Sequence, residues 1–79
     1  MKMYHLKDLN NDLYYGYKAK LTEREVRDVM LEYLYFENIH DLSYEEILNN
    51  TNGMTNNEIA KITRYEIEEV IWELKTNMR

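Results

Sequence analysis

Carboxylates are the most numerous groups in this chain that could do chemistry, with 15 Asp and Glu residues against 10 Lys and Arg in 79 residues. Four of them gather in the last third of the sequence: Glu66, Glu68, Glu69 and Glu73. Such a group repels a phosphate backbone. On a small rigid body, however, carboxylates can imitate phosphates and occupy the basic channel of a nucleic-acid enzyme. The plainer interpretation is a solvated surface face, which is what a run of charges usually forms.

Residues suited to catalysis or metal binding are few. There is no cysteine, which excludes disulfides, thiolate metal sites and cysteine nucleophiles. The spacing of Glu37 and His40 matches one half of a carboxylate-bridged di-iron motif, but such a site needs a second copy and two further glutamates. The sequence contains no glycine-rich phosphate loop. We therefore expect a protein that is not an enzyme and that binds neither a metal nor a cofactor.

The first 20 residues carry the opposite charge to the rest. Residues 1–20 hold four Lys against two Asp, whereas residues 21–42 sum to −4 and residues 43–79 to −3. Lys18 and Lys20 follow three tyrosines that could stack on the bases of a single-stranded nucleic acid. Arg64 and Tyr65 are the other candidates for nucleic-acid contact. The patch is small, and half of it is needed for the core.

Four capping boxes indicate where helices begin. In this motif a hydroxyl side chain and a Glu three residues later bond each other's backbone N–H groups. The pairs are Thr22 with Glu25, Ser43 with Glu46, Thr55 with Glu58, and Thr63 with Glu66. Each pair is bracketed by two apolar residues spaced as a hydrophobic staple. The sequence therefore predicts four helices, over residues 23–38, 44–49, 56–61 and 64–77.

The N-terminal segment, residues 3–21, alternates as a β-hairpin does. From Leu13 to Leu21 apolar or aromatic residues recur at every second position, and Asn and Asp residues fill the expected turn before them. A short helix is the alternative interpretation. A two-stranded ribbon is unstable alone, so its apolar face must lie on the helices. We expect an α+β fold, mainly α, in a single domain of residues 1–79, with a hairpin over 1–21 and helices over 22–79.

Apolar stripes at helical spacing predict the core. Val29, Leu34, Ile67 and Val70 lie at the centres of their stripes, and we expect them to be buried. Tyr35 and Phe36 fall beside the stripe of the first helix. They either widen its buried face or form an exposed aromatic patch.

Residues 55–74 contain a set of residues at defined spacings. They are Glu58, Ile59 and Ala60 in a first helix, Val70 ten residues after Ala60, and Leu74 at the end. In this pattern the segment, about a quarter of the chain, resembles a helix-turn-helix module. Two positions depart from it: Arg64 stands where Gly is usual, and Thr63 where an aliphatic residue is usual. The resemblance implies that residues 64–77 would enter a DNA major groove, although their carboxylates are badly placed for that. The alternative is one continuous helix over 56–77.

The chain is small, acidic with a pI near 4.9, free of cysteine, rich in Asn, and contains eight Tyr. In size and composition it resembles proteins of phages and mobile elements, including the anti-CRISPR proteins. That resemblance implies an inhibitor that binds a host nucleic-acid-handling protein, with DNA charge mimicry as one means. The competing function is a helix-turn-helix transcriptional regulator that binds DNA.

The expected partner-binding residues are the four clustered carboxylates and two aromatics: Glu66, Glu68, Glu69, Glu73, Tyr35 and Phe36. A protein partner is favoured, binding to DNA is possible, and the protein would be a monomer or homodimer. The sequence has no long apolar run at its start, so we expect no membrane association and a cytoplasmic location.

Overall fold

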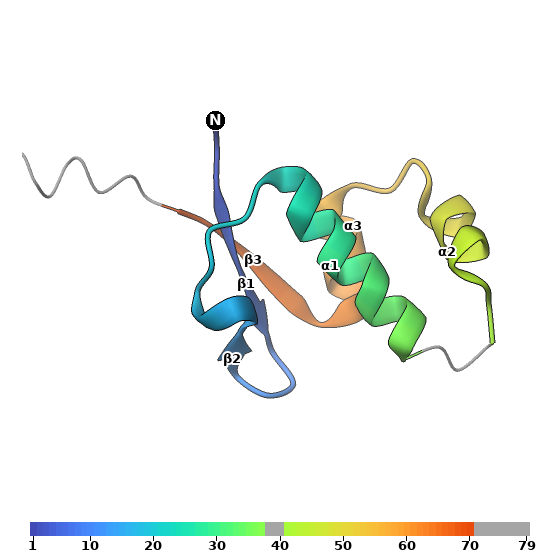
Figure 1. Cartoon of the computed structure of the whole chain (residues 1–79), viewed down its shortest axis with the longest axis horizontal. Coiled ribbons are helices and arrows are strands. Elements are labelled where there is room, and N and C mark those ends of the chain that lie inside the picture. The colour runs from blue at the N-terminus through green and yellow to red at the C-terminus, as the bar shows by residue number, and fades with distance from the viewer. Residues whose placement is uncertain (38–40, 71–79) are drawn as a thin grey trace, which may run out of the picture.

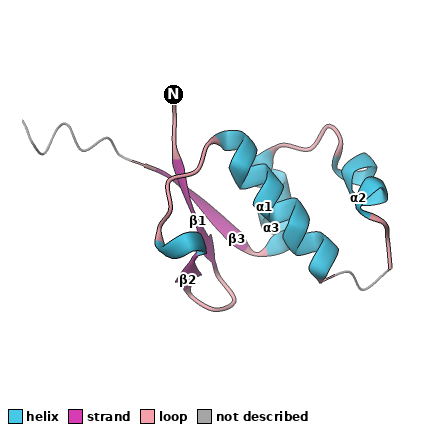
Figure 2. Cartoon of the chain, in the orientation of Figure 1, coloured by secondary structure: helices cyan, strands magenta, loops and turns pink. Residues whose placement is uncertain are grey.

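The computed structural model describes residues 1–37 and 41–70 (Figure 1). In chain order the elements are β1 (Tyr4–Asp8), β2 (Leu13–Tyr14), a 3-10 turn η1 (Tyr15–Tyr17), α1 (Glu23–Phe36), α2 (Tyr44–Thr51), α3 (Asn56–Thr63) and β3 (Tyr65–Glu69). Figure 2 shows the strands gathered at one end and the helices beside them. The described part of the chain is thus an α+β arrangement of three α-helices and a three-stranded antiparallel sheet.

The first three predicted helix starts are confirmed, and each begins with a complete capping box. At α1 the backbone N–H of Glu25 donates to the Thr22 hydroxyl at 3.2 Å, and the backbone N–H of Thr22 donates to the Glu25 carboxylate at 2.8 Å. Ser43 and Thr55 start α2 and α3 in the same way. These contacts join residues three apart, so the local sequence is sufficient to place them.

The fourth predicted helix, over 64–77, is wrong across residues 65–69, which form β3. Thr63 is the last residue of α3, and its hydroxyl donates to the Ile59 carbonyl at 3.0 Å instead of capping a new helix. Arg64 then takes a left-handed conformation, with φ 63°, which ends α3 and turns the chain. The segment resembling a helix-turn-helix therefore lacks its second helix in the described residues.

Pairing with β1 explains why residues 65–69 are extended. β1 is the central strand of the order β2-β1-β3, and all five of its residues pair with β3. Leu6, which is fully buried, lies opposite Ile67. Tyr65 and Ile67 alternate with glutamates, which suits a strand with one buried and one exposed face. That alternation competes in the sequence with the helical stripe through Val70, and the sheet partner decides between them.

The predicted hairpin over 3–21 is wrong in its second limb. β2 contains two residues and pairs with the end of β1, after which the chain coils into η1. Gly16, Tyr17 and Lys18 have positive φ, and three such residues in succession end a regular strand. The chain rejoins the sheet at Leu21, through an isolated bridge to Tyr4. The predicted architecture, a hairpin on four helices with a helix-turn-helix half, is therefore corrected to three helices against a sheet that β3 completes.

The core lies between the sheet and the helices. α1 packs on α3 and α2 packs on α1, while α3 also packs on β3 (Figure 1). The buried apolar residues are Leu6, Leu21, Val26, Met30, Leu31, Ile47, Ile59 and Ala60. Val29, Leu34 and Ile67 are half-buried around this cluster, as Val70 is at the end of the described chain. The four predicted core residues thus lie at the margin of the core. Its centre includes Leu6 of β1, a strand that the helical stripes could not predict.

Hydrogen bonds from Arg27 and Asn56 join the helices. The Arg27 guanidinium, on α1, donates to the Thr51 and Met54 carbonyls and to the Asn56 side-chain oxygen, each at 2.9 Å. The Asn56 amide donates in turn to the Glu23 carbonyl at 3.0 Å. Arg27 therefore binds the end of α2, the following loop and the start of α3 to α1.

We expect Leu6→Ala to lower the free energy of unfolding by about 2–5 kcal/mol, because it empties the centre of the core. Urea denaturation measures this. Leu13→Ala is the matched control, since Leu13 is 65% exposed and should cost far less. Equal losses in the two variants would contradict the placement of β1 at the centre.

We expect Arg27→Met to lower the free energy of unfolding by about 1–3 kcal/mol, because it leaves the carbonyls of Thr51 and Met54 without their donor. The control is Arg24→Met on the same helix, where the arginine is exposed. Thermal melts of both variants give the comparison. If Arg24→Met costs as much as Arg27→Met, the three hydrogen bonds do not hold the helices together.

Candidate interaction surfaces

Three aromatic side chains form an exposed cluster where α1 ends and α2 begins. The Tyr35 ring lies edge-on to Phe36 and to Tyr44, with ring centroids 6.1 and 5.9 Å apart. Phe36 is 79% exposed, Tyr35 45% and Tyr44 37%. We call Tyr35, Phe36 and Tyr44 the aromatic patch. Tyr35 and Phe36 thus do not widen the buried face of α1. Sequence reasoning missed Tyr44, although its place at the first helical residue after a cap was a usable sign of exposure.

Carboxylates continue from the aromatic patch along α1. Glu25, Asp28 and Glu32 are exposed, and spacings of three and four residues put them on one side of the helix, in line with Phe36. We call these three residues the α1 acidic row. Among the described residues, Asp28 and Glu32 make no ion pair. Their charge is therefore available to a cationic partner.

The four clustered carboxylates predicted as one helical face are not together. Alternation along β3 puts Glu66 and Glu68 on the sheet face turned away from the helices, whereas Glu69 shares the helix-facing side with Ile67. Glu69 lies 4.0 Å from the Lys2 ammonium. Glu73 lies outside the described residues. The single acidic face expected over 64–77 is therefore corrected to two glutamates on the outer face of the sheet.

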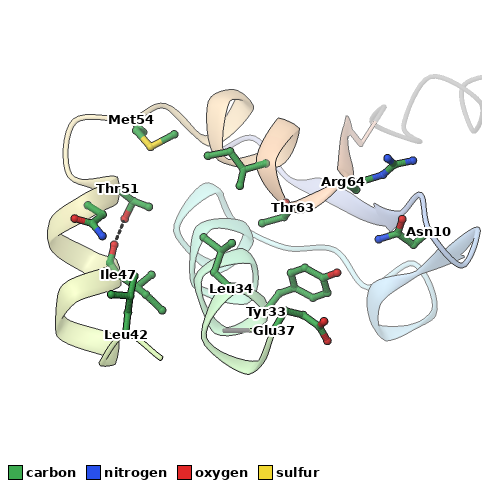
Figure 3. A pocket seen from close by; sticks show the side chains of 12 residues that line it. Asn10, Tyr33, Leu34, Glu37, Leu42, Ile47, Thr51, Met54, Thr63 and Arg64 are labelled. Carbon is green, nitrogen blue, oxygen red and sulfur yellow. Dashed lines mark hydrogen bonds between the residues drawn. The ribbon is translucent and has the colours of Figure 1, made fainter. Parts of the chain in front are cut away.

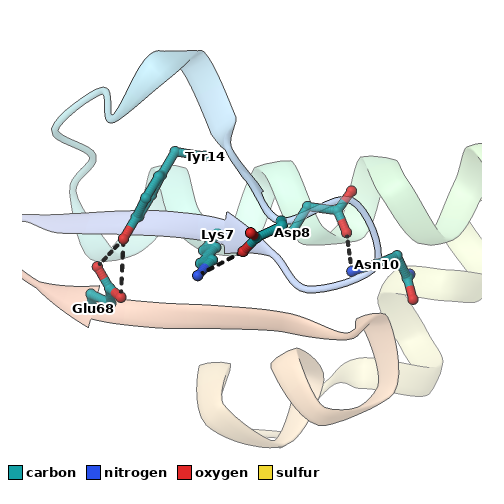
Figure 4. Close-up of polar contacts among 6 residues, drawn as sticks. Lys7, Asp8, Asn10, Tyr14 and Glu68 are labelled. Atoms are coloured by element: carbon teal, nitrogen blue, oxygen red, sulfur yellow. Dashed lines mark hydrogen bonds and ion pairs between the residues drawn. The ribbon is translucent and has the colours of Figure 1, made fainter.

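The outer face of the sheet holds a polar network (Figure 4). The Tyr14 hydroxyl donates to the Glu68 carboxylate at 3.1 Å, and the Lys18 ammonium lies 4.7 Å from the centre of the Tyr14 ring. The hydrogen bond to Glu68 raises the pKa of Tyr14 above its usual 10, and partial burial adds to the shift. The ion pair with Asp12, at 2.9 Å, raises the pKa of Lys7. These side chains are engaged with one another, which fits a structural role.

The structure separates the predicted nucleic-acid contacts. Lys18 and Lys20 are exposed beside β2, whereas exposed Arg64 forms the turn between α3 and β3. Tyr65 is half-buried, and its ring packs edge-on against Tyr33 with centroids 5.3 Å apart. Burial raises the Tyr65 pKa, with a smaller contribution from the charge of Asp8. Tyr65 cannot stack on a base without leaving Tyr33.

An apolar groove of about 500 Å³ lies between the C-terminal half of α1, α2 and α3 (Figure 3). Its apolar lining includes Tyr33, Leu34, Leu42, Ile47, Met54 and Ile62. The hydroxyls of Thr51 and Thr63 also line it, but both donate to carbonyls of their own helices. Asn10, Glu37, Asn50 and Arg64 complete the lining, so polar and charged side chains stand beside the apolar ones.

The described residues contain no group of three His, Cys, Asp or Glu side chains placed to hold a metal ion. The Glu37 and His40 spacing noted in the sequence falls partly outside them, because His40 is not described. No helix in the described ranges is long and apolar enough to cross a membrane. Comparisons with protein families, curated proteins and solved structures found no match to this chain.

Replacing Glu68 with Gln should lower the pKa of Tyr14 toward 10, because the acceptor loses its charge. A raised pKa means that the native state keeps a proton which the unfolded state loses. The contact therefore stabilises the fold below about pH 10 and loses that effect as the pH rises further. Alkaline titration of phenolate absorbance, with Tyr14→Phe subtracted, measures the shift. Glu32→Gln, the same charge change on α1, is the control and should leave Tyr14 unchanged.

Proposed function

We propose that this protein is a non-enzymatic inhibitor that binds a nucleic-acid-handling protein of a host cell, as the phage and mobile-element proteins of similar size and composition do. It would act in the cytoplasm as a monomer or homodimer. The observation that carries the proposal is the surface on α1, where the α1 acidic row leads into the aromatic patch.

The chemistry of this surface matches a basic protein surface. The net charge of the chain is −5, and the carboxylates of Asp28 and Glu32 make no ion pair within the described residues. Long-range attraction of this kind speeds association with a positively charged channel and favours the correct partner. Exposed tyrosine and phenylalanine rings supply contact area at low entropic cost and can bind arginine through cation–π contact.

A protein partner fits these features better than DNA does. The carboxylates of the α1 acidic row repel phosphates. The helix that would have entered a major groove is a strand over residues 65–69, and Tyr65 is engaged with Tyr33. The DNA-binding regulator therefore remains only as an outcome of the test below.

The test uses host proteins eluted from immobilised duplex DNA, which are then offered to the full-length protein. We expect the protein to capture one of them, duplex DNA to compete, and capture to weaken steeply with salt. Asp28→Lys with Glu32→Lys should abolish capture, and so should Tyr35→Ala with Phe36→Ala. Exposed substitutions of this kind usually change stability by less than about 0.5 kcal/mol, so folding should be kept.

The control is Asp12→Lys, which makes the same type of charge change in the turn between β1 and β2. Two results would contradict the proposed surface. One is loss of capture in Asp12→Lys alone, and the other is normal capture by the α1 variants. A gel shift against random duplex DNA at low salt covers the alternative. Micromolar binding that Lys18→Glu and Lys20→Glu weaken would replace the inhibitor with the DNA-binding regulator.

A further inference from the structure

β3 is an outer strand of the sheet, and only one of its edges is paired with β1. Antiparallel strands alternate between pairs that exchange backbone hydrogen bonds and pairs that do not. The Leu9 N–H donates to the Arg64 carbonyl at 2.9 Å, and the Val70 N–H to the Met3 carbonyl at 2.8 Å, so the bonded residues of β3 are the even-numbered ones. The peptide groups of Tyr65, Ile67 and Glu69 therefore point away from β1.

These outward peptide groups have no hydrogen-bond partner among the described residues, since the backbone and side-chain hydrogen bonds around β3 go to other atoms. The strand contains five residues, about 17 Å of extended backbone. An exposed edge of that length is a template on which another strand can pair.

Charge decides which strand fits. On the outer face of the sheet, β1 places Lys7 opposite Glu66 and His5 opposite Glu68. A strand added to the other edge of β3 would lie beside the same two carboxylates and would need cations at alternate positions. Its other positions would lie beside Tyr65 and Ile67, which are half-buried, so apolar residues suit them.

A second copy of this chain does not meet these requirements. If two β3 strands paired antiparallel about Ile67, so that all five residues were used, Glu66 of each copy would lie opposite Glu68 of the other. Like charges directly opposite each other destabilise a strand pair. Charge repulsion therefore disfavours this pairing of β3 with a second copy of itself.

We propose that the outer edge of β3 binds an extended basic segment of a partner protein by strand addition, with Lys or Arg alternating with apolar residues. This site is separate from the α1 acidic row and goes beyond the proposed function. The incoming backbone bonds to the peptide groups of Tyr65, Ile67 and Glu69, and its cations pair with Glu66 and Glu68.

The experiment uses the full chain, labelled with ¹⁵N, and two soluble heptapeptides. In one, Lys alternates with Val and Thr; in the other, Glu replaces every Lys. The Lys peptide should shift the amide signals of Tyr65, Ile67 and Glu69 and slow their hydrogen exchange. The amides of Glu66 and Glu68 should be protected before any peptide is added. The Glu peptide should not bind.

Two variants sharpen the test. Glu69→Pro removes one outward N–H and leaves the bonds to β1 in place, since proline is tolerated on an edge strand. It should weaken binding about fivefold to tenfold, as expected for one lost hydrogen bond. Glu66→Lys keeps the edge but leaves Glu68 as the one carboxylate of the pair, so it should remove most of the preference for the Lys peptide over the Glu peptide. Glu45→Lys, at an exposed position on α2, is the control and should bind the Lys peptide as the wild type does.

Three results would overturn the proposal. The first is equal binding of the two peptides. The second is a set of signal shifts confined to α1. The third is protection of the outward amides that rises with protein concentration in the absence of peptide, which would make a second copy the occupant. The peptide titration probes the β3 edge and does not depend on the capture experiment. The proposed function of the α1 surface can therefore be wrong while the proposal for β3 is right.

Discussion

The pairing of β1 with β3 is the contact on which the rest of the structure depends. β1 and β2 alone make a short ribbon, which is too small to be stable in water. β3, from the other end of the described chain, adds a third strand and leaves Leu6 fully buried opposite Ile67. Val26 from α1 and Ile59 from α3 complete that centre, and both are fully buried. One strand pair thus closes the chain and gives the helices a surface to cover.

Covering one face of the sheet determines what each outer surface can be. The face away from the helices carries Lys7, Glu66 and Glu68. Most of the charged side chains on this face contact one another or the Tyr14 ring. On the outer side of α1, no ion pair within the described residues involves Asp28 or Glu32. The charge of these two carboxylates therefore stays available, and the last turn of α1 exposes the Tyr35 and Phe36 rings. This difference is why α1, and not the glutamates around β3, is the better candidate for attracting a distant basic partner.

The Arg27 guanidinium contributes three hydrogen bonds to the joint between the helices. α2 and α3 are eight residues each, too short to be stable as isolated helices. Arg27 supplies donors to the carbonyls at the end of α2 and in the following loop, which would otherwise depend on water. The planar fork of arginine suits several acceptors at once, whereas a lysine ammonium is a point charge. The apolar groove lies beside this joint, between α1, α2 and α3.

The sequence alone determined the features that depend on neighbouring residues. Three capping boxes placed the starts of α1, α2 and α3, because a hydroxyl and a glutamate three residues apart interact whatever the rest of the chain does. The tertiary structure decided everything that required a distant partner. Thr63 and Glu66 match the same motif, yet β1 pairs with residues 65–69 and pulls Glu66 into a strand. Arg27 gave no local signal, since its acceptors lie 24 or more residues away. A capping box stabilises only the first turn of a helix. At Thr63 and Glu66 the pairing of β1 with β3, which buries Leu6, stabilises the chain more than that box would.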